Sequence, residues 1–312
     1  MFYEISITPS VFKFASYGSR ELCDAELRGI WTDLNGSLVV RDLRAGEWHR
    51  SLWQNKTESS FFAQKILKAL RDDKRLRRAS PVLLQEPADS VAWCREALAS
   101  HGRDELSGVM TCPSLKQHFR DEDIVCAIDQ RHRSGSWWSS LVVGGPTRIR
   151  RTTAGYQQAL SVLLRGANHL VFMDPHLDPE RNDYREFKNL LVMASRSDGV
   201  QPVIEIHRVC YEGLQDRRRV DDAEWERRFR KLRPDLQRAG LEAEVFIWPE
   251  EHDRHILSDL GGVHMGNGFT INNNPKSFST WTRLPRNTAD AVRREFDPSV
   301  NRPHHRFKIV GC

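Results

Sequence analysis

Helical and strand patterns alternate along the C-terminal half of this 312-residue chain, and this alternation constrains the fold more than any other feature. From Thr152 onward, apolar residues recur at spacings of three and four, and short apolar runs separate these stretches. The expected helices lie within 152–167, 184–194 and 225–239, and the expected strands are 170–173, 203–206 and 245–248. Such alternation predicts an α/β domain with a mostly parallel sheet covered by helices on both faces.

The N-terminal half is less regular, and we expect it to form a separate mixed α/β domain of unknown role. Its expected elements are an alternating strand over 2–7, a hairpin-like stretch over 36–42, a helix over 59–70 with a solvated charged run over 72–78, a buried strand over 82–84, and a helix capped by Asp89. Gly, Ser and Pro between Arg131 and Pro146 mark the domain boundary. We therefore predict domains at 1–135 and 136–312.

The composition indicates a globular protein with a basic bias. The formal net charge is +5, and arginine predominates among the basic residues. The arginine bias fits an anionic substrate such as nucleic acid, although genome composition explains it as well. Trp31, Trp48, Trp53 and Trp93 are expected in the core or at an interface, with base stacking as the alternative.

Cysteine spacing and hydropathy exclude several classes of protein. Six cysteines occur without any C-x2-C pair, which argues against a zinc ribbon or a dense disulfide framework. No apolar run approaches about 18 residues, and the N-terminus lacks the features of a signal peptide. We expect a cytoplasmic protein without a transmembrane segment.

The main candidates for catalytic residues follow the last expected strand of the alternating region. There the sequence reads His252-Asp253-Arg254-His255-Ile256-Leu257-Ser258-Asp259, and Gly266-Asn267-Gly268 comes soon after. Side chains two residues apart on a strand point to the same face, so His252 and Arg254 are expected to share one pocket. A nucleophilic imidazole and a phosphate-binding guanidinium would then lie together.

This order resembles the His-x-Lys-x4-Asp-x6-Gly-Ser-x-Asn signature of the phospholipase D superfamily, with Arg254 in place of Lys and Phe269 in place of Asn. The stretch 150–285 is more closely similar to the phospholipase D-like C-terminal domain of MIT-domain proteins, which also has an Asp-Pro like Asp174-Pro175-His176. That domain is regarded as a lipid- and partner-binding module. The resemblance implies a phospholipase D-like fold for the second domain.

The resemblance also implies roles for individual residues, without a metal or other cofactor. His252 would attack phosphorus, and a second histidine would protonate the leaving oxygen. Arg254 would hold the phosphoryl oxygens, Asp259 would be a structural partner, and Asn267 would supply a stabilising amide. Because His304-His305-Arg306 lacks the rest of a second motif, catalysis would require a homodimer that shares one site between two chains.

Further candidates for substrate binding follow other strands or lie in a basic segment. His176, His207 and Arg208 lie at strand ends, where sites form in such sheets. Arg217, Arg218 and Arg219 could follow a nucleic-acid backbone. Ordinary turn residues and a solvated charged segment are the alternative interpretations.

Two hypotheses of function follow. The first is that the protein is a metal-independent phosphodiesterase, and in particular a nuclease that acts as a homodimer through His252. The alternative is a catalytically inactive binding module of the same fold for nucleic acid, a phospholipid headgroup or a protein partner. Membership of a larger assembly, such as a bacterial defence system, suits either hypothesis.

Overall fold

The chain forms two α/β units, and each is described by itself. The computed structural model describes residues 1–54, 60–72, 75–133, 136–138, 145–196, 200–213, 217–250, 253–272, 274 and 276–310. The chain divides into the compact units Phe2–Gly144 and Gly145–Cys312. The expected two-part organisation is therefore present, with the division at 144 rather than at the predicted 135.

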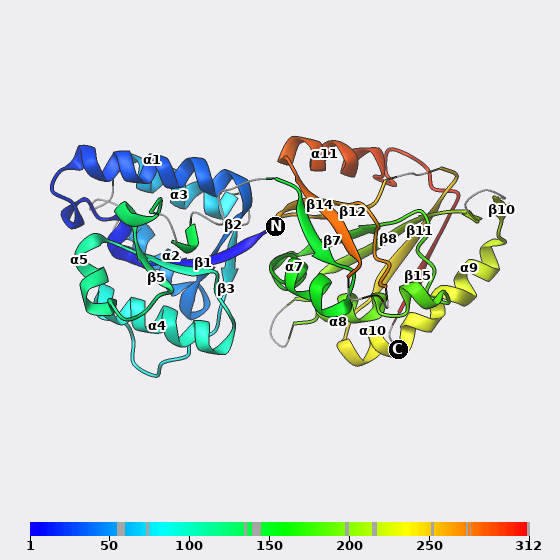
Figure 1. Ribbon diagram of the computed structural model, residues 1–312, viewed down its shortest axis with the longest axis horizontal. Coiled ribbons are helices and arrows are strands. Elements are labelled where there is room, and N and C mark those ends of the chain that lie inside the picture. The colour runs from blue at the N-terminus through cyan, green and yellow to red at the C-terminus, as the bar shows by residue number, and fades with distance from the viewer. Residues whose placement is uncertain are drawn as a thin grey trace. The chain divides into compact units, whose positions relative to one another are not determined.

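The first unit contains a five-stranded parallel sheet with the order β3-β2-β1-β4-β5. Its strands are β1 (Tyr3–Ile7), β2 (Leu38–Asp42), β3 (Leu76–Arg78), β4 (Gly108–Thr111) and β5 (Val125–Ala127). Its α-helices are α1 (Arg20–Ser37), α2 (Leu43–Gln54), α3 (Phe61–Asp72), α4 (Ser90–Arg103) and α5 (Pro113–Lys116). Figure 1 shows α1 and α3 on one face of the sheet and α4 on the other. This is a doubly wound arrangement, in which crossover helices cover both faces.

Several expectations for this unit are confirmed and three are wrong. The strand at the N-terminus and the two expected helices are present, and the Asp89 side chain caps α4 by accepting from Ala92 N at 2.8 Å. The stretch 36–42 is not a hairpin, because α1 continues to Ser37 and β2 pairs parallel to β1. The charged run at 72–78 contains β3, and 82–84 is not a strand, since Leu84 is fully exposed.

A buried ion pair joins the central strands of the first unit. Arg41 on β2 is fully buried and donates from Nε and Nη2 to the two carboxylate oxygens of Glu4 on β1, at 2.8 and 3.0 Å. Arg77 on β3 donates to the same carboxylate at 2.6 Å. Trp48 and Trp93 lie in the hydrophobic core, as expected. The five described cysteines of the chain are free and buried.

The second unit contains an eight-stranded mixed sheet with the order β15-β11-β8-β7-β12-β13-β14-β6. The strands in chain order are β6 (Thr147–Arg150), β7 (His169–Met173), β8 (Val203–Val209), β11 (Ala243–Trp248), β12 (His255–Ser258), β13 (Gly261–Met265), β14 (Phe278–Leu284) and β15 (His305–Ile309). A small separate ribbon pairs β9 (Tyr211–Glu212) with β10 (Arg218–Arg219).

The prediction of a mostly parallel sheet is wrong for this unit. Only the β7–β8 and β8–β11 pairings of the described sheet are parallel. After β11, six residues lead into β12, which is too short a connection for the crossover that a parallel strand needs. The chain therefore turns back at this edge, and β12 pairs antiparallel with both β7 and β13.

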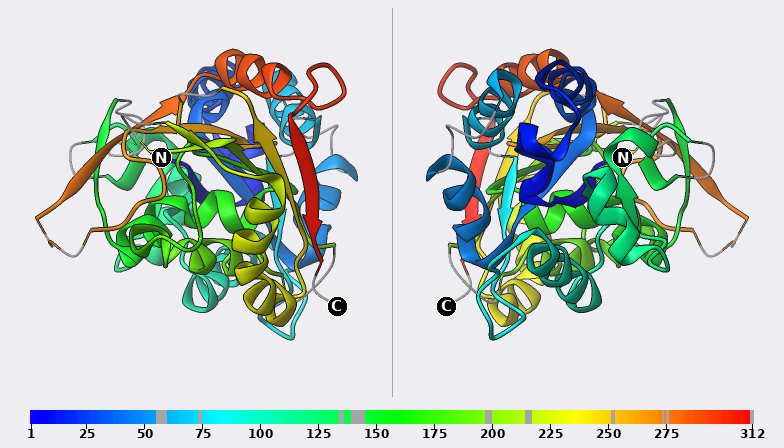
Figure 2. Two further views of the ribbon diagram at one scale, coloured as in Figure 1. Left: turned by 90° about the vertical axis from the view of Figure 1, so that its right-hand side faces the viewer. Right: turned by 90° about the vertical axis from the view of Figure 1, so that its left-hand side faces the viewer.

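Helices cover both faces of the mixed sheet, as Figures 1 and 2 show. On one face lies α11 (Arg286–Glu295), whose Ala289 packs with Val171, Met173 and Leu257. On the other face lie α7 (Thr153–Gly166), α8 (Phe187–Val192) and α10 (Arg233–Ala239). The helix α9 (Asp222–Phe229) precedes α10, which ends at Gly240 in the left-handed conformation, as expected.

Candidate functional site

The centre of the candidate site is the carboxylate of Asp174, which directly follows β7. Asp174 is completely buried. One carboxylate oxygen, Oδ1, accepts from His176 N at 3.0 Å, and Oδ2 accepts from Tyr184 Oη at 2.9 Å and Phe269 N at 3.1 Å. Burial raises the pKa of Asp174, while these hydrogen bonds and Arg254 oppose the rise. Asp174 thus joins three segments at the carboxyl edge of β7.

Arg254 lies immediately before β12, next to this carboxylate. Its Nε is 3.7 Å from Asp174 Oδ1, and about 29% of its side chain remains exposed. Within the described part of the chain, Asp174 is the only carboxylate at ion-pair distance from Arg254. The guanidinium therefore lies beside the buried carboxylate, and its exposed part is accessible to an anion.

A glycine turn completes the packing around this pair. Gly268 has φ +58°, and a Cβ there would lie 1.9 Å from Asp174 Oδ2 and 2.9 Å from Arg254 Cδ. The preceding Asn267 is exposed, and its N–H donates to Ser279 Oγ at 3.1 Å. Glycine is therefore required at 268 both by backbone conformation and by space.

The motif strand is shorter than predicted. β12 begins at His255, so the alternation of faces expected from His252 through Ile256 applies only from His255 onward. His252 itself lies outside the described residues. His176 is half-buried, and burial lowers the pKa of its imidazole. The charge of Arg254 lowers this pKa as well, while the charge of Asp174 opposes the shift.

Asp259 lies at the opposite end of β12 from Arg254 and does not join the Asp174 site. Its carboxylate accepts from Asn168 N at 2.9 Å and from Asn168 Nδ2 at 3.0 Å. These bonds tie the β12–β13 turn to the residue that precedes β7. The spacing in the sequence alone could not reveal this, because the four residues of β12 carry Asp259 away from Arg254.

His207 is buried away from solvent, so the structure does not place it at a substrate surface as predicted. It is 1% exposed, and its Nδ1 accepts from Trp248 Nε1 at 3.0 Å. Its Nε2 lies 3.2 Å from Glu205, which also contacts His169 Nε2 at 3.1 Å. Burial lowers the pKa of His207. This neighbourhood explains why a histidine can be part of the core.

Arg208 is also 1% exposed and therefore not available to a substrate. Its guanidinium donates to the carbonyl oxygens of Val209, Leu177 and Tyr211 at 2.6, 2.9 and 2.6 Å. Its Cζ lies 3.4 Å from the ring centroid of Trp225. Burial lowers the pKa of Arg208 to about 9. The side chain is a structural cross-link, and the prediction that it binds substrate is not supported.

The basic segment 217–219 is partly neutralised by the side chains around it. Arg217 is exposed and beside residues that are not described. Arg218 pairs with Glu212, and Arg219 donates to His304 Nε2 at 2.7 Å. A hollow of about 370 Å³ is lined by Arg219, Val220, Asp221, Asp222 and His304. Its two aspartates weaken the predicted attraction for a phosphate backbone.

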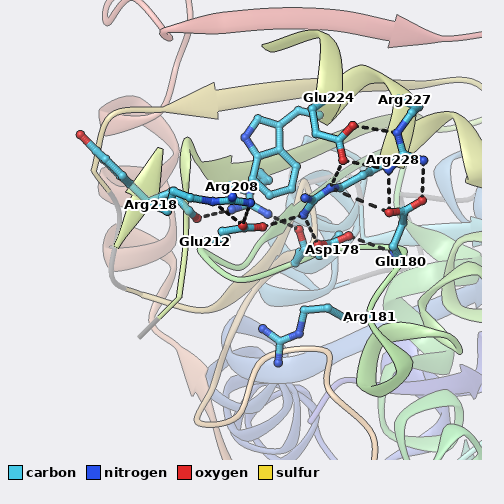
Figure 3. A network of polar contacts seen from close by, with 12 residues as sticks. Asp178, Glu180, Arg181, Arg208, Glu212, Arg218, Glu224, Arg227 and Arg228 are labelled. Carbon is cyan, nitrogen blue, oxygen red and sulfur yellow. Dashed lines mark hydrogen bonds and ion pairs between the residues drawn. The ribbon is translucent and has the colours of Figure 1, made fainter. Parts of the chain in front are cut away.

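The same region contains a dense ion-pair network, drawn in Figure 3. Arg228 lies 2.7 Å from Asp178, 2.9 Å from Glu212 and 2.8 Å from Glu224. Arg227 pairs through both terminal nitrogens with Glu180 at 2.8 Å. These carboxylates compensate the arginines of α9, so that this helix is not an uncompensated basic surface. The helix α9 is thus a charged helix whose arginines are balanced by neighbouring carboxylates.

No protein family and no curated protein matches the chain. Among solved structures, it is weakly similar to TrmBL2, an archaeal chromatin protein whose structure is described as showing a novel mode of DNA binding. The two are 8% identical, and the alignment covers 78% of this chain and 81% of that chain with a TM-score of 0.29. A similarity of this size does not establish a shared fold or function.

Sequence reasoning missed Tyr184 and the role of Phe269. Tyr184 was expected only as an apolar residue of a helix, yet its hydroxyl donates to Asp174. Phe269 is 1% exposed, and its ring lies 5.4 Å from Phe172 and 5.3 Å from Phe187, measured between centroids.

Within the described residues, no helix is long and apolar enough to cross a membrane, and no group of three or more His, Cys, Asp or Glu could hold a metal ion.

Proposed function

We propose that the second unit is a phospholipase D-like phosphodiesterase, specifically a nuclease, in which Arg254 binds the phosphate and His252 attacks it. The observation that supports this proposal is the placement of Arg254. A partly exposed guanidinium is held by a buried carboxylate at the carboxyl edge of β7, beside the exposed Asn267 turn. Arg254 offers a small anionic group a charge, and the exposed Asn267 supplies a side-chain amide as a hydrogen-bond donor, since the backbone N–H groups of the turn are already bonded.

In the proposed reaction, an imidazole nitrogen of His252 forms a bond to phosphorus while the bond from phosphorus to the leaving oxygen breaks. A general acid gives a proton to that oxygen, and water then hydrolyses the phosphohistidine. His176 is poorly suited as the acid, because burial lowers its pKa and favours the neutral ring. We therefore propose that His252 of a second copy donates the proton, in a homodimer.

The test is cleavage of end-labelled single-stranded DNA and RNA in the presence of EDTA. We expect cleavage by the wild-type protein, none by His252→Ala, and unchanged cleavage by His132→Ala, which removes an exposed histidine of the first unit. Label from an internally phosphorylated substrate should remain on the protein in an acid-labile, base-stable form. A strictly monomeric protein that cleaves, or full activity of His252→Ala, would contradict this mechanism.

A specific observation favours the second candidate function, which is phosphate binding without turnover. Phe269 replaces the Asn of the signature and is packed among aromatic rings, and Asp174 offsets part of the charge of Arg254. Under this alternative, labelled nucleic acid binds in a salt-dependent manner but no product forms. Arg254→Met, which keeps an unbranched stem and removes the guanidinium charge, should weaken that binding.

A further inference from the structure

The outer pair of strands in the second unit carries an exposed aromatic ring between two arginines. In the antiparallel β6–β14 ribbon, Phe278 is opposite Arg150, and Thr280 is opposite Arg148. The Cζ atoms of Arg148 and Arg150 lie 4.7 and 5.8 Å from the ring centroid of Phe278. Phe278 is 37% exposed, while Ser279 and Trp281 on the opposite side of the ribbon are buried. Figure 2 shows β14, in orange, extending outward from the body of this unit.

The two arginines differ from the basic segment that the sequence suggested. Arg148 and Arg150 are exposed, and within the described residues neither has a carboxylate at ion-pair distance. By contrast, Arg218 pairs with Glu212, and Arg219 lies beside His304. Lys276, just before β14, is also exposed. The ribbon is therefore a basic surface whose charge is not compensated locally.

Uncompensated arginines around an exposed ring have the chemistry of a binding surface for single-stranded nucleic acid. Guanidinium groups neutralise phosphates, and unstacked bases stack on aromatic faces and on guanidinium planes. A base inside a duplex is already stacked on its neighbours, so that a ring on a β-ribbon has no free base face to contact. Acidic peptides would use the charges but would gain little from the ring. An anionic lipid surface would use both, so that vesicle binding has to be measured beside nucleic-acid binding.

The ribbon is connected directly to the candidate site. Gly266 N donates to Thr280 O at 3.1 Å, and Asn267 N donates to Ser279 Oγ at 3.1 Å. The turn next to Arg254 is therefore hydrogen-bonded to β14 one and two residues after Phe278. A strand stacked on Phe278 would be led along β14 toward the turn that precedes Gly268.

We propose that Phe278, Arg148 and Arg150 form a stacking platform that binds single-stranded nucleic acid and directs it to the Arg254 site. The inference rests on the proposed nucleic-acid substrate but not on cleavage. It assigns substrate selection to the β6–β14 ribbon rather than to the segment 217–219.

The experiment measures binding of fluorescein-labelled oligo-dT by fluorescence anisotropy at several salt concentrations, using the full chain with His252→Ala to prevent cleavage. We expect Phe278→Leu to weaken binding about tenfold and Phe278→Trp to retain it. The double variant Arg148→Ala/Arg150→Ala should reduce the slope of log K against log salt by about 1.4, since each phosphate contact on a single strand contributes about 0.7.

The matched control is Arg218→Ala/Arg230→Ala, which removes the same charge from two exposed, ion-paired arginines. This variant should bind oligo-dT as the parent does. Equal weakening by both double variants would overturn the proposal in favour of general charge attraction. Equally tight binding of anionic phosphatidylserine vesicles, or equally tight and Phe278-independent binding of a duplex, would also overturn it. Platform-dependent binding without cleavage by the wild-type protein would refute the nuclease and leave the platform intact.

Discussion

The Nε atom of Arg254 lies 3.7 Å from Oδ1 of Asp174, and the carboxylate has no contact with solvent. A buried carboxylate needs compensation, which here comes from three hydrogen bonds and this one cation. The partly exposed guanidinium is the outermost member of the group. An arriving anion would compete with Asp174 for Arg254 without having to displace the buried hydrogen bonds.

We expect Asp174→Ala to lower the free energy of unfolding by about 3–5 kcal/mol, because it leaves buried donors and a cation without their acceptor. Asp259→Ala is the matched control. It also removes an acceptor of backbone N–H groups, but water can reach this turn, so we expect a loss of about 1 kcal/mol. Urea unfolding of both variants measures the difference. Similar losses would show that Asp174 is not the organising residue.

Gly268→Ala should disrupt the site far more than a positive φ alone would explain. The added Cβ would overlap with Asp174 Oδ2 and press on Arg254. Gly240→Ala is the control, since Gly240 has φ +64° with no atom within 4 Å of the new Cβ. We expect about 1 kcal/mol of destabilisation for Gly240→Ala and several times that for Gly268→Ala. Thermal unfolding and phosphate binding together would detect the effect.

The network around α9 predicts unequal effects of two nearby arginines. Arg228 is 12% exposed and lies at ion-pair distance from four carboxylates, whereas Arg230 is 67% exposed and pairs only with Glu226 in the described structure. Arg228→Ala should cost about 3–5 kcal/mol because it leaves partly buried carboxylates unpaired. Arg230→Ala should cost about 0.5 kcal/mol or less. Chemical denaturation would contradict this prediction if the two variants were equally stable.

Stability should fall as the pH drops from about 7 toward about 5, because burial lowers the pKa of His176, His207 and His255 in the folded protein. Unfolded histidines, with a pKa of about 6.5, bind protons first, so the unfolded state gains protons before the native state does. Each histidine contributes at most about 1.4 kcal/mol per pH unit to this slope. Urea unfolding across this pH range measures the slope.

A substitution of His255 tests this pH dependence of stability most directly. It is 4% exposed, and within the described residues neither ring nitrogen makes a hydrogen bond, Nε2 lying 3.5 Å from Asp253. His255→Phe should therefore preserve stability near pH 7 and flatten its decline in acid. A marked loss of stability at neutral pH would show that the imidazole has an essential polar partner.

Local patterns in the sequence correctly predicted elements whose causes are local. Apolar spacing located α7 and β7, Asp89 marked the start of α4, and Gly240 marked the end of α10. Each of these signals acts within one or two turns of a helix or along a single strand, so a short window of sequence contains it. The division into two α/β units followed from the same patterns and from chain length.

Contacts with residues that are distant in the sequence decided which side chains are accessible and which charges are compensated. The direction of β12 depends on a short connection, the burial of His207 depends on Trp248 and Phe296, and the free charge of Arg148 depends on which carboxylates the fold brings near it. Arg218 and Arg148 look alike in the sequence, yet only Arg218 meets a glutamate. Electrostatic energy and solvation depend on distances in space, and those distances exist only once the chain has folded.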